Sequence, residues 1–423
     1  MTTSLKGLGT KIAIIYHSAD MDGLMSGTLA RKAFELINSK FYNNDLIGFT
    51  LIPYNYGKDP KVDKWLDHEN PENKFDYYQF IDVTPPKEFL QTIAYKIIND
   101  QIMVDIFDHH LNIMKEIQQF VTKDLFLSDG FKYFFDSDKS GALIYYNSLK
   151  ESKNWLTRLL QFHEKNTNKI YAHHLNLAPN FLQRIFPTIF LIGKIQDEFN
   201  YWFFSSKMEE LMSLVSKYDT WQWYSEKLDK NTYSSDLPLA LNEYFTGEYR
   251  EDNFQFYYKS LFEYSHKINS KTDPKEDGNY PQIDMFTNNG YSNIQNKTKI
   301  AELAFHQIVP VLQTKICLIA SSGYDYYYDT ETVKKRMKKI DGDTPVPFRD
   351  YSGLYAVIYY KINFKTQNVK ISIRSLNENN FDACDFVKRL TGDNGGGHRG
   401  AAGGSLTLKD FIHYTTFETI HHG

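Results

Sequence analysis

The sequence predicts an α/β protein whose first domain is built around a parallel sheet. Short apolar runs alternate with segments of helical periodicity, as in repeated strand–helix–strand units. Three of the predicted strands end in carboxylates or imidazoles, and ligands bind at the carboxyl ends of the strands in open α/β sheets. The apolar content of 42% and the charged content of 24% are ordinary for a globular protein, and 423 residues suffice for two domains.

The first predicted strand leads into a loop with a histidine and two aspartates. Residues 11–16 form an apolar run, and residues 24–37 have helical periodicity. The loop between them holds His17, Asp20 and Asp22. Capping a helix and compensating its dipole can account for one or both aspartates. Two aspartates together with a histidine exceed what capping needs, so we expect a binding site here.

The next strands bring another acid to the same edge. Residues 46–56 and 77–83 are predicted strands, and Asp82 lies near the end of the second. A proline pair closes that strand. Residues 87–98 then form a plausible amphipathic helix, which completes a second strand–helix unit.

The fourth strand ends in three polar residues. Residues 102–107 are apolar apart from Asp105 and lead directly to Asp108, His109 and His110. Adjacent side chains of an extended strand point in opposite directions. We therefore expect one histidine to bind metal and the other to face a substrate.

The rest of the first half adds one acid and several helices. Ser140 begins a helix that continues to residue 149 and serves either as its cap or as a donor to an anion. Residues 155–162 and 179–195 are mainly helical in pattern, and Asp219 stands between aromatic neighbours.

The candidate ligands together favour a two-metal site. They are two histidines and four aspartates: His17, Asp20, Asp22, Asp82, His109 and Asp219. An oxygen-rich set with a little imidazole favours Mn²⁺, Mg²⁺ or Fe²⁺ over structural zinc. A single metal would leave close carboxylates uncompensated. Two metals bridged by a carboxylate form a standard device for phosphoester hydrolysis.

The composition suggests a division of the chain into two domains. Residues 269–297 are rich in Asn, Lys, Asp, Gly and Pro, which predicts an exposed linker or an insertion. We expect a catalytic domain over 1–268, a linker or insertion over 269–299 and a second domain over 300–423. In that domain, 300–312 is a predicted helix, and the predicted strands are 315–320, 354–363 and 369–375.

Two features of the second domain indicate ligand binding. The strand over 369–375 places Ser372 and Arg374 near its end, and arginine presents a planar fork suited to phosphate, although an exposed edge-strand arginine fits equally. The segment 392–404 contains three consecutive glycines followed by His398. Such a glycine run permits close backbone approach to a ligand, and it also occurs in plain flexible loops.

Charge, cysteine content and hydropathy narrow the class of protein. At a net charge of −4, any nucleic-acid contact must come from a local basic patch. The first ten residues lack the apolar core of a signal peptide, and no apolar stretch approaches the ~20 residues that span a bilayer. The two cysteines match neither a disulfide framework nor a zinc site. We expect a soluble, cytoplasmic protein.

These motifs resemble those of the DHH/DHHA1 phosphoesterases. The segment from His17 to Gly23 resembles the first motif of that family, and Asp82 resembles the second. Asp108-His109-His110 resembles the motif that gives the family its name. Asp219 resembles the fourth motif, with Asp197 as the alternative. Residues 372–375 and 395–403 resemble the phosphate-contacting strand and the glycine-rich motif of the DHHA1 domain.

The resemblance implies a fold and a set of site residues. It implies a Rossmann-like N-terminal DHH domain, a smaller C-terminal α/β DHHA1 domain, and an active site in the cleft between them. One Mn²⁺, or Mg²⁺ or another divalent cation, would be held by His17, Asp20 and Asp82. A second would be held by Asp22, Asp82, His109 and Asp219. Asp108 would orient a neighbouring side chain, and His110 would face the scissile phosphate. The C-terminal domain would bind nucleotide through Ser372, Arg374, Gly395, Gly396, Gly397 and His398.

The activity implied is Mn²⁺-dependent hydrolysis of short oligonucleotides, such as nanoRNA and linear dinucleotides, to nucleoside monophosphates. Water would attack phosphorus in line, with His110 and Arg374 stabilising the developing charge. The alternatives are a cyclic-dinucleotide phosphodiesterase, a 3′-phosphoadenosine 5′-phosphate phosphatase, a single-strand DNA 5′ exonuclease and a catalytically inactive nucleotide-binding protein. The expected partners are short RNA or a dinucleotide, or single-stranded DNA, with no membrane and with a homodimer as the assembly.

Overall fold

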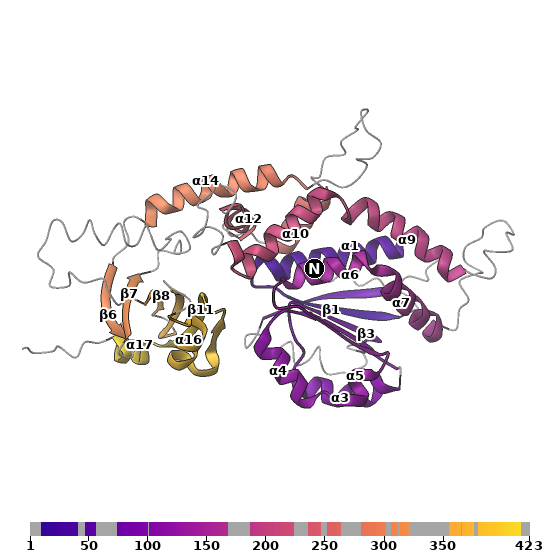
Figure 1. Ribbon diagram of the computed structural model, residues 1–423, viewed down its shortest axis with the longest axis horizontal. Helices are drawn as coiled ribbons and strands as arrows, with labels where there is room; N and C mark the ends of the chain where they lie inside the picture. The colour runs from indigo at the N-terminus through magenta and orange to yellow at the C-terminus, as the bar shows by residue number, and fades with distance from the viewer. Residues whose placement is uncertain are drawn as a thin grey trace, which may run out of the picture. The chain divides into compact units, whose positions relative to one another are not determined.

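A computed structural model of the 423-residue chain shows two compact units, Met1–Gly290 and Tyr291–Gly423, which we describe one at a time (Figure 1). The structure describes residues 10–40, 47–55, 74–99, 101–167, 187–223, 236–246, 252–263, 281–301, 306–311, 314–320, 355–364, 366–375 and 380–415.

The first unit contains a parallel sheet of five strands in the order β2-β1-β3-β4-β5. The strands are β1 (Lys11–His17), β2 (Gly48–Tyr54), β3 (Tyr77–Ile81), β4 (Met103–Asp108) and β5 (Phe131–Phe135). The predicted α/β class and parallel sheet are therefore confirmed. Only β5 was not anticipated, because this edge strand is half-exposed and its aromatic run shows neither a continuous aliphatic stretch nor strict alternation.

Helices cover both faces of this sheet (Figure 1). On one face lie α1 (Met21–Asn38), α6 (Gly141–Lys150) and α7 (Ser152–Thr167), with α9 (Pro187–Phe203) and α10 (Ser206–Asp219) packed against them. On the other lie α3 (Lys87–Ile98), α4 (Leu111–Phe120) and α5 (Lys123–Leu127). Alternate residues of β1 explain this, because Ile12 and Ile14 enter the first core while Ala13 and Ile15 enter the second. Both faces are buried, which leaves the strand ends as the place for polar chemistry.

Residues 283–301 are a helix where the composition predicted a linker or insertion. This helix, α14 (Ile283–Ala301), buries Ile283 and Phe286, and the Phe286 ring stacks on Tyr244 of α12 (Leu237–Thr246) at 4.8 Å. Gly290, its one glycine, allows α14 to lie close to α12, since a Cβ at this position would lie 1.8 Å from the carbonyl oxygen of Ala240. Polar residues dominate this segment and suggested a linker. Its few buried apolar residues, Ile283 and Phe286, do not stand out in the composition. Before α14 lie α13 (Asn253–Tyr258) and η4 (Lys259–Glu263). The predicted domain limits stay predictions.

The second unit contains a mixed sheet of six strands in the order β10-β11-β9-β8-β7-β6. Its strands are β6 (His306–Val311), β7 (Thr314–Ala320), β8 (Ala356–Asn363), β9 (Asn368–Ser375), β10 (Gly395–Gly397) and β11 (Ala401–Thr407). The helices α16 (Ala383–Thr391) and α17 (Leu408–Thr415) pack on one face, and the short 3₁₀ turn η7 (Gly392–Asn394) follows α16.

The prediction of a helix over 300–312 is wrong for its second half. Residues 306–311 form β6, which pairs antiparallel with β7 at the edge of the sheet. Pro310 lies in β6, and an edge strand tolerates a proline because one side of its backbone makes no ladder bonds. The conformation of this segment depends on its pairing with a strand farther along the chain, and a local sequence pattern carries no information about such pairing.

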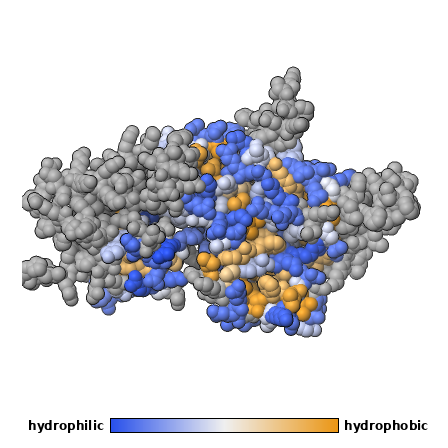
Figure 2. Space-filling view, viewed as in Figure 1, coloured by the Kyte–Doolittle hydropathy of each residue, from blue (hydrophilic) through white to orange (hydrophobic). Residues whose placement is uncertain are grey.

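Two surface features bear on the expected partners. In the described part of the chain, no helix is both long and apolar enough to cross a membrane. Figure 2 shows apolar side chains gathered over α5 and the neighbouring part of α3, where Tyr95, Ile98, Phe126 and Leu127 are exposed. Exposed apolar surface of this kind is typical of protein contacts. The predicted homodimer stays a prediction, to be tested by measuring the mass in solution.

Candidate metal centre

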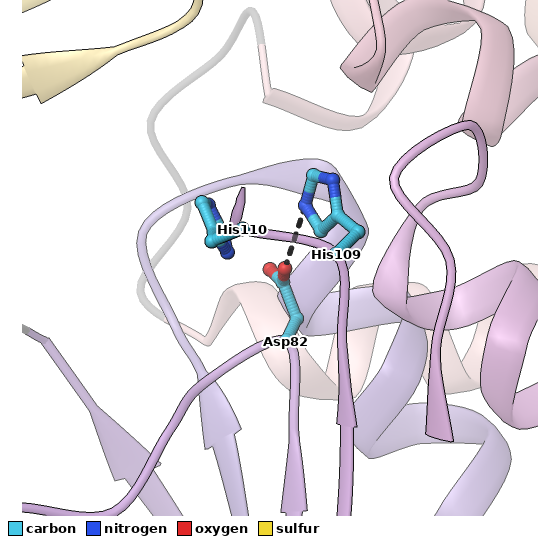
Figure 3. Close-up of side chains that lie close together, drawn as sticks. All are labelled: Asp82, His109 and His110. Carbon is cyan, nitrogen blue, oxygen red and sulfur yellow. Dashed lines mark ion pairs between the residues drawn. The ribbon is translucent and has the colours of Figure 1, made fainter. Parts of the chain in front are cut away.

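The carboxyl ends of three neighbouring strands bring the predicted ligands of the first unit together. His17 is the last residue of β1, Asp82 follows β3 and His109 follows β4. Asp219, the last residue of α10, reaches the same place from the helical layer. In Figure 3 the Asp82 carboxylate and the His109 ring point toward one another, with His110 beside them. Parallel strands end at one edge of a sheet, so residues far apart in the sequence meet there.

Asp82 lies between two imidazoles. Its Oδ2 is 3.5 Å from His17 Nδ1, and its Oδ1 is 3.3 Å from His109 Nε2. His17 Nδ1 also lies 2.9 Å from Asp20 Oδ2, and His109 Nε2 lies 3.1 Å from Asp219 Oδ2. Each carboxylate oxygen of Asp82 therefore faces a different set of ligand atoms, which is the arrangement that a bridging carboxylate needs.

The backbone of Asp82 is in the left-handed region, at φ 57°. This conformation is uncommon for residues other than glycine, and aspartate and asparagine tolerate it best. The Asp82 N–H donates to the carbonyl of Phe107 at 2.8 Å, so the strand ladder holds the turn in place. Strain of this kind is found at functional sites, where surrounding structure maintains it.

Asp20 and Asp22 are each anchored by backbone amides. Asp20 Oδ1 accepts from the Gly23 N–H at 3.0 Å and so caps α1, while its other oxygen faces His17. Asp22 accepts from Gly141 N–H at 2.7 Å and Ala142 N–H at 2.9 Å, at the start of α6. The capping interpretation thus holds for Asp20, whose ligand role stays a prediction. Sequence reasoning missed the two amides that hold Asp22, although the glycine directly after Ser140 was a signal.

Gly141 allows α6 to approach the centre. A Cβ at this position would lie 2.6 Å from Asp82 Cβ and 2.9 Å from Asp82 Cα. We expect Gly141→Ala to lower the free energy of unfolding by about 1–3 kcal/mol. We also expect it to weaken the binding of divalent cations, because it displaces two candidate ligands. Thermal unfolding with and without Mn²⁺ tests this.

The matched control for that substitution is Gly193→Ala in α9, where an added Cβ has no heavy atom within 4 Å. Alanine there should raise the free energy of unfolding by about 0.5–1 kcal/mol, because glycine is a poor helix former. Equal effects of the two variants would contradict the role given to Gly141.

Asp108 organises the two histidines that follow it. Its side chain is fully buried, and its Oδ1 accepts from His109 N–H at 2.7 Å and from His110 N–H at 3.1 Å. His110 Nδ1 lies 2.7 Å from the same oxygen, and the Thr84 hydroxyl donates to the other. Thr84 was not anticipated, since a threonine before a proline pair carries no sequence signal of a contact with a distant acid.

The expectation that the two imidazoles point in opposite directions is wrong. Their ring centroids are 4.3 Å apart, with 47° between the planes. The strand ends at Asp108, and His110 is already the N-cap of α4. The turn between strand and helix removes the alternation of an extended backbone, so both rings reach the same side.

The donor atoms fit divalent cations. Three sets have ligand atoms within 4.8 Å of one another in the described part: His17, Asp20 and Asp82; Asp22, His109 and Asp219; Asp82, His109 and His110. Asp82 Oδ1 and Asp219 Oδ2 are buried and accept no hydrogen bond within the described residues. Both oxygens face His109 Nε2, at 3.3 Å and 3.1 Å, and a cation held by these three atoms would give each oxygen a partner. Asp197, the alternative to Asp219, is exposed on α9 and belongs to none of these sets.

Charges in the centre shift the pKa of nearly every member. Burial raises the pKa of Asp219 to about 6, helped by Asp82 and opposed by His109. Burial, Asp82 and Asp219 raise the pKa of Asp22 well above its ordinary value. Burial would lower the pKa of His17, but Asp20 and Asp82 outweigh it and raise it to about 11. The carboxylates repel one another, and a cation would relieve that repulsion.

Metal should therefore stabilise the protein more at neutral than at acidic pH. Without metal, the raised pKa of Asp219 means that its contribution to stability is present below its unfolded pKa and is lost as the pH rises through about 6. Metal binding needs the ionised carboxylates, so it has the opposite dependence. We expect the rise in melting temperature caused by Mn²⁺, relative to protein with chelator, to grow between about pH 5 and 7.5. A rise independent of pH would contradict this.

Two of the predicted binding residues of the second unit, Ser372 and Arg374, lie on one face of its sheet. Ser372 and Arg374 alternate along β9 with the core residues Ile371 and Ile373, so they project away from α16 and α17. Arg374 Nη1 donates to Ser372 Oγ and to the Ile373 carbonyl, both at 3.0 Å.

The glycine-rich segment is a strand pair rather than a flexible loop. Gly395, Gly396 and Gly397 form β10, and Gly396 pairs with Gly403, which pairs with Ser372 on β9. The His398 N–H donates to the Ala401 carbonyl at 2.7 Å and closes the hairpin. A Cβ at Gly396 would meet no heavy atom within 4 Å, so the sheet is open at this glycine.

Comparison with known proteins identifies part of the second unit. The family model described as "DHHA1 domain" matches residues 348–414, which confirms the DHHA1 domain that the glycine-rich motif predicted. No curated protein matches the chain.

Three solved structures align with most of this chain at low identity and low TM-score. CDC45 from Entamoeba histolytica has 12% identity and a TM-score of 0.38, over 96% of this chain and 94% of that one. The pGpG-specific phosphodiesterase PggH from Vibrio cholerae has 10% identity and a TM-score of 0.34, over 96% and 95%. RecJ from Thermus thermophilus, in complex with Mn²⁺, has 13% identity and a TM-score of 0.37, over 96% of this chain and 51% of that one.

Proposed function

We propose that the chain, whose residues 348–414 match the DHHA1 domain, is a Mn²⁺-dependent phosphodiesterase of short oligonucleotides. The supporting observation is the position of Asp82, whose two oxygens face His17 and His109 at the shared edge of the sheet. Two cations joined by one carboxylate suit phosphoester hydrolysis. The expected products are nucleoside monophosphates.

We assign the metal-holding roles by the geometry of the ligand sets. His17, Asp20 and Asp82 would hold one cation, and Asp22, His109 and Asp219 would join Asp82 in holding the other. When bound, divalent cations supply Lewis-acid chemistry that activates water and neutralises phosphoryl charge. The amides of α6 that bind Asp22 keep this side chain in place before metal arrives.

We propose that a ring N–H of His110 donates a hydrogen bond to a phosphoryl oxygen of the substrate. Burial would lower its pKa, but Asp108 outweighs burial and raises it, which favours the charged imidazolium. The carboxylate of Asp108, held by Thr84 and two backbone amides, fixes the ring orientation. A preoriented cationic donor stabilises charge that develops in the transition state.

The DHHA1 domain is proposed to bind the nucleotide. Arg374 offers a guanidinium for phosphate, and the open surface at Gly396 offers backbone amides and room for a ligand. His398, at the end of β10, would add a polar contact.

The test is product release from the linear dinucleotide 5′-pApA with Mn²⁺ and after its removal by chelation. Parallel samples contain cyclic di-AMP, 3′-phosphoadenosine 5′-phosphate and short single-stranded DNA. Fast AMP release that requires Mn²⁺ supports the proposal. Preference for another substrate would keep the metal centre and move the activity to that substrate. Metal binding without any cleavage would overturn the enzyme proposal in favour of a nucleotide-binding protein.

A further inference from the structure

Trp221 occupies a backbone position that normally calls for glycine. The helix α10 ends at Asp219, Thr220 is its C-cap, and Trp221 follows with φ 62°. Helices commonly end with a left-handed residue at this position, usually glycine, because a side chain there is strained. A tryptophan held in this conformation indicates that its ring has a use that offsets the strain.

The ring of Trp221 belongs to an aromatic group. It lies 5.8 Å from the ring of Trp223, and Trp223 stacks on Tyr218 at 6.2 Å with 11° between the planes. Trp223 is buried, whereas Trp221 and Tyr218 are partly exposed. The buried ring anchors the group, and the partly exposed rings offer aromatic surface to a ligand.

This group borders the metal centre. Asp219, two residues before Trp221, places Oδ2 3.1 Å from His109 Nε2. Gln222, the next residue, donates from Nε2 to the Asp138 carbonyl at 2.9 Å. Asp138 lies in the turn that leads into α6, the helix whose first amides bind Asp22. The segment 220–223 is thus tied to two candidate ligands, one through the chain and one through α6.

We propose that Trp221 stacks on one nucleobase of the substrate and makes the first unit selective for nucleoside phosphodiesters over phosphate esters without a base. This inference rests on the proposed phosphoesterase function. Aromatic side chains bind unpaired bases by stacking, with little dependence on the base. The competing explanation is that Trp221 only packs against Trp223, in which case its loss should lower stability without changing binding.

The substitution Trp221→Gly distinguishes the two explanations. Trp221→Gly relieves the left-handed strain and removes the ring, so the melting temperature should stay the same or rise. The Michaelis constant for the linear dinucleotide should increase about tenfold, since stacking on one base contributes about that factor in affinity. Trp221→Phe should keep most of the binding. The control Trp202→Phe, in α9, should leave the Michaelis constant unchanged.

Base-free substrates locate the stacked base. Two analogues of 5′-pApA, each with one base removed, are compared in the wild type and in Trp221→Gly. The analogue that lacks the stacked base should show a raised Michaelis constant in the wild type and no further rise in the variant. If Trp221→Gly leaves the Michaelis constant for the intact dinucleotide unchanged in an active enzyme, this inference fails while the proposed function stands.

A binding measurement covers the case of no turnover. A dinucleotide with 2-aminopurine in place of adenine is titrated with each protein and excited outside the tryptophan band. Stacking on Trp221 should quench the probe in the wild type and not in Trp221→Gly. Quenching without turnover would overturn the hydrolase proposal and keep the stacking site. Equal quenching by both proteins would overturn the stacking site.

Discussion

Asp82→Asn is expected to lower phosphodiester hydrolysis by at least about 10³-fold while the fold survives. Asparagine tolerates the left-handed backbone of Asp82 and matches the shape of the side chain. It removes the negative charge that faces His17 and His109, both of which lie within 3.5 Å of the carboxylate. Bound manganese per chain after dialysis should fall together with activity, which we would measure by elemental analysis.

The matched control is Asp76→Asn. Asp76 directly precedes β3, at the opposite end of the strand from Asp82. Asp76 Oδ2 accepts from the Lys11 N–H at 2.8 Å, and asparagine can keep that bond. We expect activity within about twofold of the wild type, because the substitution changes nothing at the carboxyl edge of the sheet. If Asp82→Asn retained more than about a tenth of the wild-type activity, the bridging role would be wrong.

His110→Ala is expected to lower kcat about 10²–10³-fold with little change in the Michaelis constant, since its donor acts mainly on transition-state charge. Asp108→Asn should lower kcat about 10- to 100-fold, as removal of an orienting partner does. The double variant should be about as active as His110→Ala alone, because asparagine can still accept from the His109 N–H and the lost charge acts on the reaction through His110. Multiplied effects would mean that the two residues act independently.

The pH dependence of activity is a second test of the roles of Asp108 and His110. Burial lowers the pKa of His110, and the Asp108 carboxylate raises it above its ordinary value. Removing that charge should lower this pKa, so activity on the alkaline side should be lost at a lower pH in Asp108→Asn. The control His413→Asn, an exposed histidine of α17, should leave the profile unchanged. An unshifted alkaline limb in Asp108→Asn would show that His110 does not act as the charged donor.

Local pattern sufficed for much of the fold. The hydrophobic pattern and the length of the apolar runs predicted the first four strands of the parallel sheet, because aliphatic strands buried on both faces are continuous apolar runs. The same local information failed for β5, β6 and α14, where pairing or packing with a distant segment decides the conformation. The edge strands β5 and β6 and the half-polar helix α14 have too few buried residues to produce a clear periodic pattern in their own sequence.

The sequence by itself determined the chemistry available to this protein. Aspartates and histidines at successive strand ends predict a metal centre, since parallel strands must end at a common edge. Tertiary structure alone decided how the side chains are used. It placed Asp82 in a left-handed turn between His17 and His109, seated Asp22 on the amides of α6, and brought the rings of His109 and His110 together. These relations depend on backbone turns and on contacts between segments more than 100 residues apart, such as Asp22 with Gly141, and periodicity carries no information about them.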